Sequence, residues 1–164
     1  MVGCMTDAAA VRPMTPEEYD AWIVDEISAY AGDLAQASGS TLEEAHLRAE
    51  QQTRDLLPDG PATAGAHLLR VLDDAGEPVG VLWLGPHPHP QRRGAGWVYE
   101  VQIDEARRGE GLGRAAMVAA ERIGREAGWT ALGLNVFGHN PRARALYDAL
   151  GYEVAATTMA KPLD

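Results

Sequence analysis

A glycine-rich loop near residue 110 has the residue types that bind a phosphate-bearing ligand. Glycine lets the backbone turn sharply and lets a ligand come close to the amide groups. A helical pattern follows the loop, so free N–H groups and the helix dipole would favour an anion, and arginines at both ends would add charge-assisted hydrogen bonds. The sequence predicts a pyrophosphate site, against the alternative of a plain strand-to-helix turn with solvated arginines. The loop consists of Arg108, Gly109, Glu110, Gly111, Leu112, Gly113 and Arg114.

Two other nucleotide-binding motifs compete for this loop. Residues 111–116 match the dinucleotide pattern G-x-G-x-x-A. That fold needs an acidic residue about 20 positions further on to bind a ribose, but residues 129–132 read Trp-Thr-Ala-Leu. The chain also lacks a G-x-x-x-x-G-K-[ST] element. A nicotinamide enzyme is therefore disfavoured, and a P-loop nucleotidase is not supported.

The loop is positioned by a predicted strand before it and a predicted helix after it. Apolar residues recur at helical spacing over 112–127, and Gly128 ends the pattern. A further strand is expected over 130–137, then a helix that starts at Asn140 and stops at Gly151. The strand before the loop covers 97–103 and alternates, with Trp97, Tyr99, Val101 and Ile103 on one side and Val98, Glu100 and Gln102 on the other.

The N-terminal part is predicted to contain a short strand over 11–14, two helices and a hairpin. Thr15 and Glu18 form a capping box that starts the first helix, and the second begins after Thr41 and stops before Pro58. Two β-like runs, 67–72 and 79–84, are joined by a turn-rich link and should pair antiparallel. Residues 152–159 would supply the last strands. The order of elements predicts one α/β domain over 1–164, a mixed sheet with helices on its faces, and disorder only at 1–8.

Two motifs resemble those of one enzyme family. The glycine loop matches R/Q-x-x-G-x-G/A of the GCN5-related N-acetyltransferase (GNAT) superfamily, and residues 132–152 resemble its later motif, L-x-V-x-x-x-N-x-x-A-x-x-L-Y-x-x-x-G-F/Y. The resemblance covers roughly 98–152, and 159–161 are similar to the family's closing strand. It implies a mostly antiparallel sheet of about six to seven strands, splayed central parallel strands and about four helices. Residues 97–152 would form the acetyl-CoA-binding core and 15–65 the acceptor side.

The resemblance also implies roles for individual residues. Tyr147 stands at the position of the family's general acid, and a phenol with a pKa of about 10 suits proton donation to the leaving thiolate. The alternatives are that Tyr147 only fills the core edge and that Asn140 only caps its helix. The loop from Arg108 to Arg114 would bind the pyrophosphate. Further cofactor contacts would come from the backbone of Val101 and Ile103, which would bind the pantetheine arm, and from Asn140, Arg142, Ala143 and Tyr147.

Glu100 is the candidate general base. An acid at the centre of a strand is rarely there for packing. An amine must lose its proton before it can attack a thioester, and a water molecule oriented by Gln102 could relay that proton to Glu100. The alternative is a carboxylate that points to solvent or pairs with an arginine.

Composition and charge limit the classes of ligand and partner that the protein is expected to bind. The chain has 24 acidic and 14 basic residues, a net charge of −10, which disfavours nucleic acid and favours a cationic acceptor. Cys4 is the only cysteine, so an internal disulfide and a thiolate zinc site are excluded. Prolines around His87 and His89 point the two rings apart, and we expect no metal site. With no membrane-spanning stretch and no signal peptide, we expect a cytoplasmic protein without membrane contact.

These observations lead to one functional hypothesis. The protein is predicted to move an acetyl group from acetyl-CoA, its co-substrate, to a primary amine of a small molecule or peptide, by direct attack in a ternary complex. A covalent route through Cys4 is disfavoured, because this residue lies near the terminus. The alternative is a non-catalytic acyl-CoA-binding sensor or partner-binding domain. The acceptor is not identified by the sequence, and a homodimer stays open.

Overall fold

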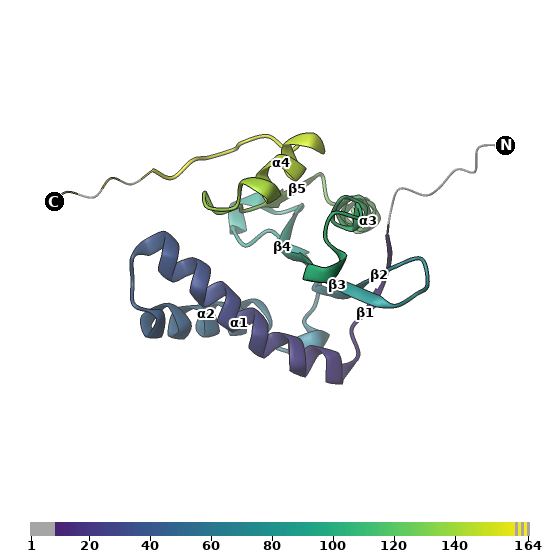
Figure 1. Ribbon diagram of the computed structural model, residues 1–164, viewed down its shortest axis with the longest axis horizontal. Helices are drawn as coiled ribbons and strands as arrows, with labels where there is room; N and C mark the ends of the chain where they lie inside the picture. Colours follow the sequence, from purple (N-terminus) through teal and green to yellow (C-terminus); the bar gives the residue numbers. More distant parts are fainter. Residues whose placement is uncertain (1–8, 160, 162, 164) are drawn as a thin grey trace.

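The computed structural model describes residues 9–159, 161 and 163, which form one mixed sheet with helices on both faces (Figure 1). The sheet order is β1-β2-β3-β4-β5, with antiparallel pairing except between β4 and β5, which are parallel. The expected α/β class and mostly antiparallel sheet are confirmed. The strands are β1 (Ala10–Pro13), β2 (His67–Leu72), β3 (Pro78–Pro86), β4 (Ala95–Ile103) and β5 (Ala131–Leu134). The helices are α1 (Pro16–Ser38), α2 (Leu42–Leu56), α3 (Leu112–Glu126) and α4 (Pro141–Ala149).

Side-chain caps start the first two helices where the sequence predicts. At α1, Glu18 N–H donates to Thr15 Oγ1 at 3.2 Å, and Thr15 N–H donates to the Glu18 carboxylate at 2.9 Å. Thr41 and Glu44 form the same reciprocal pair at α2. Each cap satisfies N–H groups that the helix leaves without a partner and stabilises it by about 1 kcal/mol.

The core lies on both faces of the sheet. Leu82 and Leu84 of β3 pack against α3, together with Met117, and are fully buried. On the opposite face, Trp22 of α1 packs against Trp83. Figure 1 shows α1 and α2 on one side of the sheet and α3 and α4 on the other. Anything bound at the middle of β4 therefore lies between two helical layers.

The expected strand count is wrong by one or more, because the described residues form five strands. Residues 152–159, expected to supply the last strands, form none, and Val154 and Met159 are exposed. Figure 1 shows this segment leaving α4 and running away from the sheet. A chain that has no neighbour to share hydrogen bonds or bury one face does not form a strand. The predictions for residues 1–8, which include Cys4, and for residue 160 of the closing strand concern residues outside the described ranges.

Candidate functional site

A β-bulge in β4 turns successive side chains toward the same side of the sheet. Trp83 pairs with Glu100, but the next residue, Leu84, pairs with Val98, so Tyr99 is the extra residue. Val98 packs in the core beneath α3, whereas Tyr99 packs with Trp83 beneath α1 and α2. Residues that pair directly share a face, so Glu100 also faces α1 and α2. The strict alternation expected along this strand is therefore wrong at Tyr99.

Glu100 lies close to a second carboxylate, that of Glu26 on α1. Glu26 follows Trp22 by one helical turn. Trp22 meets Trp83 of β3 edge-on with ring centroids 5.6 Å apart, and Trp83 is the strand partner of Glu100, so this face of α1 lies over β3 beside Glu100. Burial, then repulsion from Glu100 and Asp33, raises the pKa of Glu26 to about 8. Burial, then repulsion from Asp33, raises the pKa of Glu100 to about 7. Near neutral pH the pair therefore holds about one proton.

No counter-charge neutralises this pair within the part of the chain that is described. Neither Glu26 nor Glu100 forms an ion pair or side-chain hydrogen bond there. The predicted alternative for Glu100, a carboxylate paired with an arginine, is therefore not observed. Partly buried carboxylates without a cation are stabilised by a proton or by a cationic ligand. This pair thus has the property expected of a proton acceptor for an amine.

Tyr147 approaches the same carboxylate from α4. Its side chain is only 8% exposed and belongs to the core beneath α3 and α4, so it does fill the core as the alternative proposed. Burial and the nearby Glu100 raise its pKa to about 12. Its hydroxyl forms no hydrogen bond with any described residue. A buried phenol that stays protonated at neutral pH is suited to proton donation.

The glycine loop forms a cradle of free amides at the start of α3. Gly109 and Gly111 have φ values of 89° and 83°, in the left-handed region that favours glycine. Gly111 is the N-cap of α3 and offers no side chain to cap it. Over the described residues, the N–H groups of 109–114 donate no hydrogen bond, and the first donor is Ala115, which bonds Gly111 O at 3.1 Å. Such free amides at the start of a long helix favour an anion.

Two arginines fix the position of this loop. Arg107, which the sequence reasoning missed, donates to the carboxylate of Asp73 in the β2–β3 turn at 2.8 Å and to the carboxylate of Glu110 at 3.0 Å. Arg108 Nε donates to the Ile103 carbonyl at 3.1 Å. The Glu110 side chain is thus held away from the loop amides. The bond between Arg108 and Ile103 joins two residues with predicted cofactor roles. Binding of a pyrophosphate by Arg108 and of a pantetheine arm by the Ile103 backbone stay predictions.

β4 and β5 separate in the middle of the sheet. Their parallel pairing runs from Ala95 with Ala131 to Val98 with Leu134, and β4 continues to Ile103 without a β5 partner. This agrees with the expected splay, and β5 is shorter than the predicted 130–137 because nothing pairs with it beyond 134. The free edge of β4 includes Val101, whose backbone the resemblance assigns to the pantetheine arm.

The start of α4 is capped by one of its own residues and is linked to α1 by a hydrogen bond. Asn140 Oδ1 accepts a hydrogen bond from Ala143 N–H at 3.1 Å, so its role as an N-cap is confirmed. His139 Nε2 lies 3.0 Å from the Asp33 carboxylate and links the turn before α4 to α1. Arg142 is exposed. Contacts of Asn140, Arg142 and Ala143 with a cofactor stay predictions.

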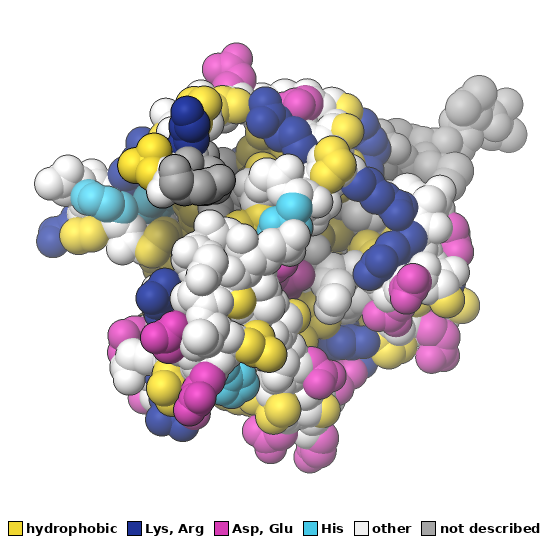
Figure 2. Space-filling model, turned by 60° about the vertical axis from the view of Figure 1, so that its left-hand side comes forward, with side chains coloured by type: hydrophobic (Ala, Val, Ile, Leu, Met, Phe, Trp, Pro, Cys, Tyr) yellow, Lys and Arg dark blue, Asp and Glu magenta, His cyan; other side chains and the backbone are white. Residues whose placement is uncertain are grey.

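Charge is divided over the face that contains these elements. Figure 2 shows Asp and Glu side chains mostly over the lower part, where α1 and α2 lie, and Lys and Arg gathered toward the upper right. A cationic acceptor would be drawn to the α1 side and an anion to the arginine-rich side. α1 has no lysine or arginine but six acidic residues, Glu17, Glu18, Asp20, Asp25, Glu26 and Asp33.

Among the described residues no three His, Cys, Asp or Glu side chains are grouped to hold a metal ion. The His87 ring instead packs edge-on against Trp97, with centroids 4.6 Å apart. No helix in the described ranges is long and apolar enough to cross a bilayer.

Sequence reasoning missed Glu26. Trp22 is buried in the core, and the Tyr30 hydroxyl donates to Gln52 of α2 at 2.9 Å, so both hold the helices together rather than line the pocket described below. The available signal for Glu26 was its spacing, one turn after Trp22 on the face that carries the apolar stripe. An acid in that stripe is costly unless it serves a site.

Replacing Glu26 with Gln should stabilise the protein at high pH. The native state holds the Glu26 proton up to about pH 8, whereas the unfolded chain releases it near the ordinary value of 4.5. The native state therefore binds more protons between these limits, and its stability falls as pH rises through them. Gln does not ionise, so the variant's Tm should exceed the wild type's by about 3 °C or more at pH 9 and by less than about 1 °C at pH 5.

Differential scanning calorimetry at both pH values tests this expectation. Asp25→Asn is the matched control, because Asp25 is the exposed neighbour of Glu26 on the same helix. A difference in Tm that is equal at pH 5 and pH 9 for Glu26→Gln would contradict the raised pKa.

Comparisons with known proteins agree with this geometry. The family model described as "Acetyltransferase (GNAT) family" matches residues 32–152. Two Bacillus subtilis relatives named as uncharacterized N-acetyltransferases are similar along nearly their full length. YycN is 33% identical over 93% of this chain and 97% of that protein. YdgE is 32% identical over 95% of this chain and 99% of that protein. The crystal structure of YycN superposes with a TM-score of 0.85, at 32% identity over 95% of this chain and 99% of that one.

Proposed function

The chain belongs to the GNAT family of acetyltransferases, and on that premise we propose that it transfers an acetyl group from acetyl-CoA to a primary amine of a small molecule or peptide. The observation that carries the proposal is the placement of Glu100 on β4 and Tyr147 on α4 beside the point where β4 and β5 separate, near enough for the Glu100 charge to raise the pKa of the phenol. Acyl transfer to an amine needs one proton acceptor and one proton donor at the same reacting carbon.

Acetyl-CoA and the acceptor would bind at two different ends of the site. The free amides of 109–114 would hold the pyrophosphate of acetyl-CoA, with Arg108 and Arg114 adding charge. The unpaired edge of β4 beyond Val98 would bind the pantetheine arm and bring the thioester to Glu100 and Tyr147. The acceptor would enter from the acidic side formed by α1 and α2, which attracts an ammonium group.

The reaction then needs two proton transfers. Glu100, directly or through water, takes a proton from the acceptor ammonium, and the neutral amine attacks the thioester carbonyl carbon. The new C–N bond forms as the C–S bond breaks, and Tyr147 donates its proton to the leaving sulfur. Solvent then returns that proton, and the surplus proton leaves Glu100. The buried phenol is a matched donor, because its pKa of about 12 keeps it protonated until the thiolate departs.

Acetyl-CoA should raise the Tm of the purified protein by about 5–10 °C at 100 times its dissociation constant. Thermal shift measures this step, and release of free thiol with a panel of primary amines measures turnover. NAD is the matched control, because it carries a pyrophosphate and an adenosine but no thioester. A shift with NAD but not with acetyl-CoA, or no thiol from any amine, would contradict the proposal, and binding without turnover would favour an acyl-CoA sensor.

A further inference from the structure

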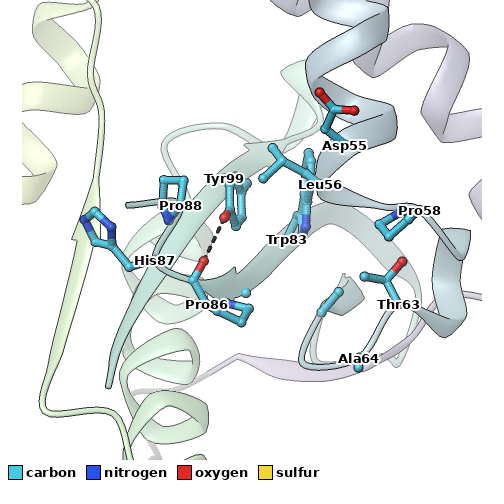
Figure 3. A pocket seen from close by; sticks show the side chains of 12 residues that line it. Asp55, Leu56, Pro58, Thr63, Ala64, Trp83, Pro86, His87, Pro88 and Tyr99 are labelled. Carbon is cyan, nitrogen blue, oxygen red and sulfur yellow. Dashed lines mark hydrogen bonds between the residues drawn. The ribbon is translucent and has the colours of Figure 1, made fainter. Parts of the chain in front are cut away.

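A pocket of about 290 Å³ lies on the side of the sheet covered by α1 and α2 (Figure 3). Its lining includes Trp83, which is the strand partner of Glu100. Its walls come from the end of α2, the loop that follows it, the end of β3 and the bulge in β4. Pro58 and Ala64 form one wall and Pro86 another, so most of the lining is apolar. None of the residues assigned above to acetyl-CoA lines it. The pocket therefore has no role in the reaction as described so far.

The floor of this pocket is a rigid aromatic pair next to the candidate base. Trp83 and Tyr99 stack with ring centroids 4.7 Å apart and an interplanar angle of 23°. The Tyr99 hydroxyl donates to the Pro86 carbonyl at 2.7 Å, which fixes its ring in place. Trp83 is the register partner of Glu100, and Tyr99 precedes Glu100 in the bulge. A group seated on these rings thus contacts the two residues that neighbour Glu100 in the sheet.

A hydrogen-bond donor in the pocket has no partner in the protein. The indole N–H of Trp83 forms no hydrogen bond with any residue that is described, and its nitrogen is not among the buried polar atoms, so it opens into the pocket. Figure 3 shows the ring nearly edge-on, with its nitrogen toward the part of the pocket where Pro86 and Ala64 lie. An indole N–H that opens into a pocket is free to donate to a ligand there. The unused donor therefore points to a ligand that brings an oxygen into the pocket.

We propose that this pocket selects the acceptor, and that the acceptor is an arylalkyl amine with an oxygen on its ring. This inference rests on the proposed function and specifies its substrate class. The ring lies on the Trp83–Tyr99 pair, its oxygen accepts from the Trp83 N–H, and its ammonium group extends to Glu100. The volume is at the small end of ligand pockets, so it suits a single ring and excludes a coenzyme. A linear polyamine would leave both the apolar lining and the indole donor unused.

An acceptor series tests the predicted class. Thiol release from acetyl-CoA is measured with tyramine, 2-phenylethylamine and putrescine. We expect kcat/KM for tyramine to exceed kcat/KM for putrescine by at least about tenfold. Because only tyramine carries the ring oxygen, its kcat/KM should also exceed that of 2-phenylethylamine by about three- to tenfold. In Trp83→Phe, which keeps an aromatic floor but loses the N–H, the difference between tyramine and 2-phenylethylamine should vanish. If putrescine matches tyramine in the wild type, the inference is overturned and the proposed function stands.

A pocket-filling variant keeps the inference testable if Trp83→Phe fails to fold. Ala64 is exposed and lines the pocket, so Ala64→Phe should raise KM for tyramine at least about tenfold and leave the thermal shift with acetyl-CoA unchanged. Ala62→Phe is the matched control, because Ala62 is exposed in the same loop but outside the pocket. Equal KM values in the two variants would overturn the inference. No thiol from any amine and no shift with acetyl-CoA would overturn the proposed function itself.

Discussion

Replacing Tyr147 with Phe should lower kcat by about 10²- to 10³-fold while the affinity for acetyl-CoA changes less than about threefold. The variant keeps the aromatic ring in the core beneath α3 and α4 and removes only the proton that would go to the departing sulfur. The hydroxyl has no hydrogen-bond partner among the described residues, so its removal should change the free energy of unfolding by less than about 0.5 kcal/mol. Steady-state kinetics, the thermal shift with acetyl-CoA and urea unfolding measure the three quantities.

Tyr152→Phe is the matched control for this experiment. The Tyr152 ring lies 5.9 Å from that of Tyr147, and its hydroxyl is buried without a partner. The two variants thus remove the same group from neighbouring rings, and Tyr152→Phe should retain kcat within about twofold, because no acyl-transfer step is assigned to it. Equal turnover in wild type and Tyr147→Phe would remove Tyr147 from the mechanism. Equal losses in both variants would mean that the effect comes from packing.

Features that depend on neighbours in the sequence could be predicted well. Thr15 and Glu18 start α1 because a capping box needs only four consecutive residues, and the same holds for α2. The free amides of 109–114 also follow from local chemistry, since glycine at 109 and 111 permits the left-handed turn that presents them. For these elements the pattern of residue types already contains the structural cause.

Features that depend on pairing between distant segments could not be predicted. The bulge at Tyr99 is a property of the register between β3 and β4, so alternation along β4 alone wrongly placed Tyr99 on the same face as Val101 and Ile103. Glu26 becomes part of the site only because α1 packs on Trp83 of β3, the strand partner of Glu100, which lies about 75 residues further along the chain than Glu26. The absence of strands over 152–159 has the same origin, because a strand exists only where a neighbour accepts its hydrogen bonds.

The bulge also explains why the site and the pocket share one side of the sheet. With regular pleating, Glu100 would lie on the same face as Val98, in the apolar core beneath α3. The extra residue moves Glu100 to the α1 side, beside the Trp83–Tyr99 pair, and leaves Val101 on the edge where β5 departs. One irregularity therefore places the candidate base, the pocket floor and the proposed thioester position within a few residues of one another.

Replacing Glu100 with Gln should lower kcat/KM about 10²-fold at pH 8 and remove an inflection from the pH profile. A general base acts only when deprotonated, so wild-type activity should rise as pH increases through the pKa of Glu100, about 7 rather than the ordinary 4.5. The ionisation of the acceptor amine lies much higher, at about 10, so the two inflections separate. Initial rates of thiol release between pH 5.5 and 9 measure this profile.

The variant Glu26→Gln tests whether Glu26 or Glu100 is the general base. The change is the same carboxylate-to-amide substitution within the same pair, and it resembles the protonated Glu26 that predominates at pH 7. We therefore expect Glu26→Gln to keep the inflection near pH 7 and Asp33→Asn to move it lower, because Asp33 repels the Glu100 charge. An inflection that persists in Glu100→Gln would exclude Glu100 as the base. A loss of the inflection in Glu26→Gln instead would assign that role to the α1 carboxylate.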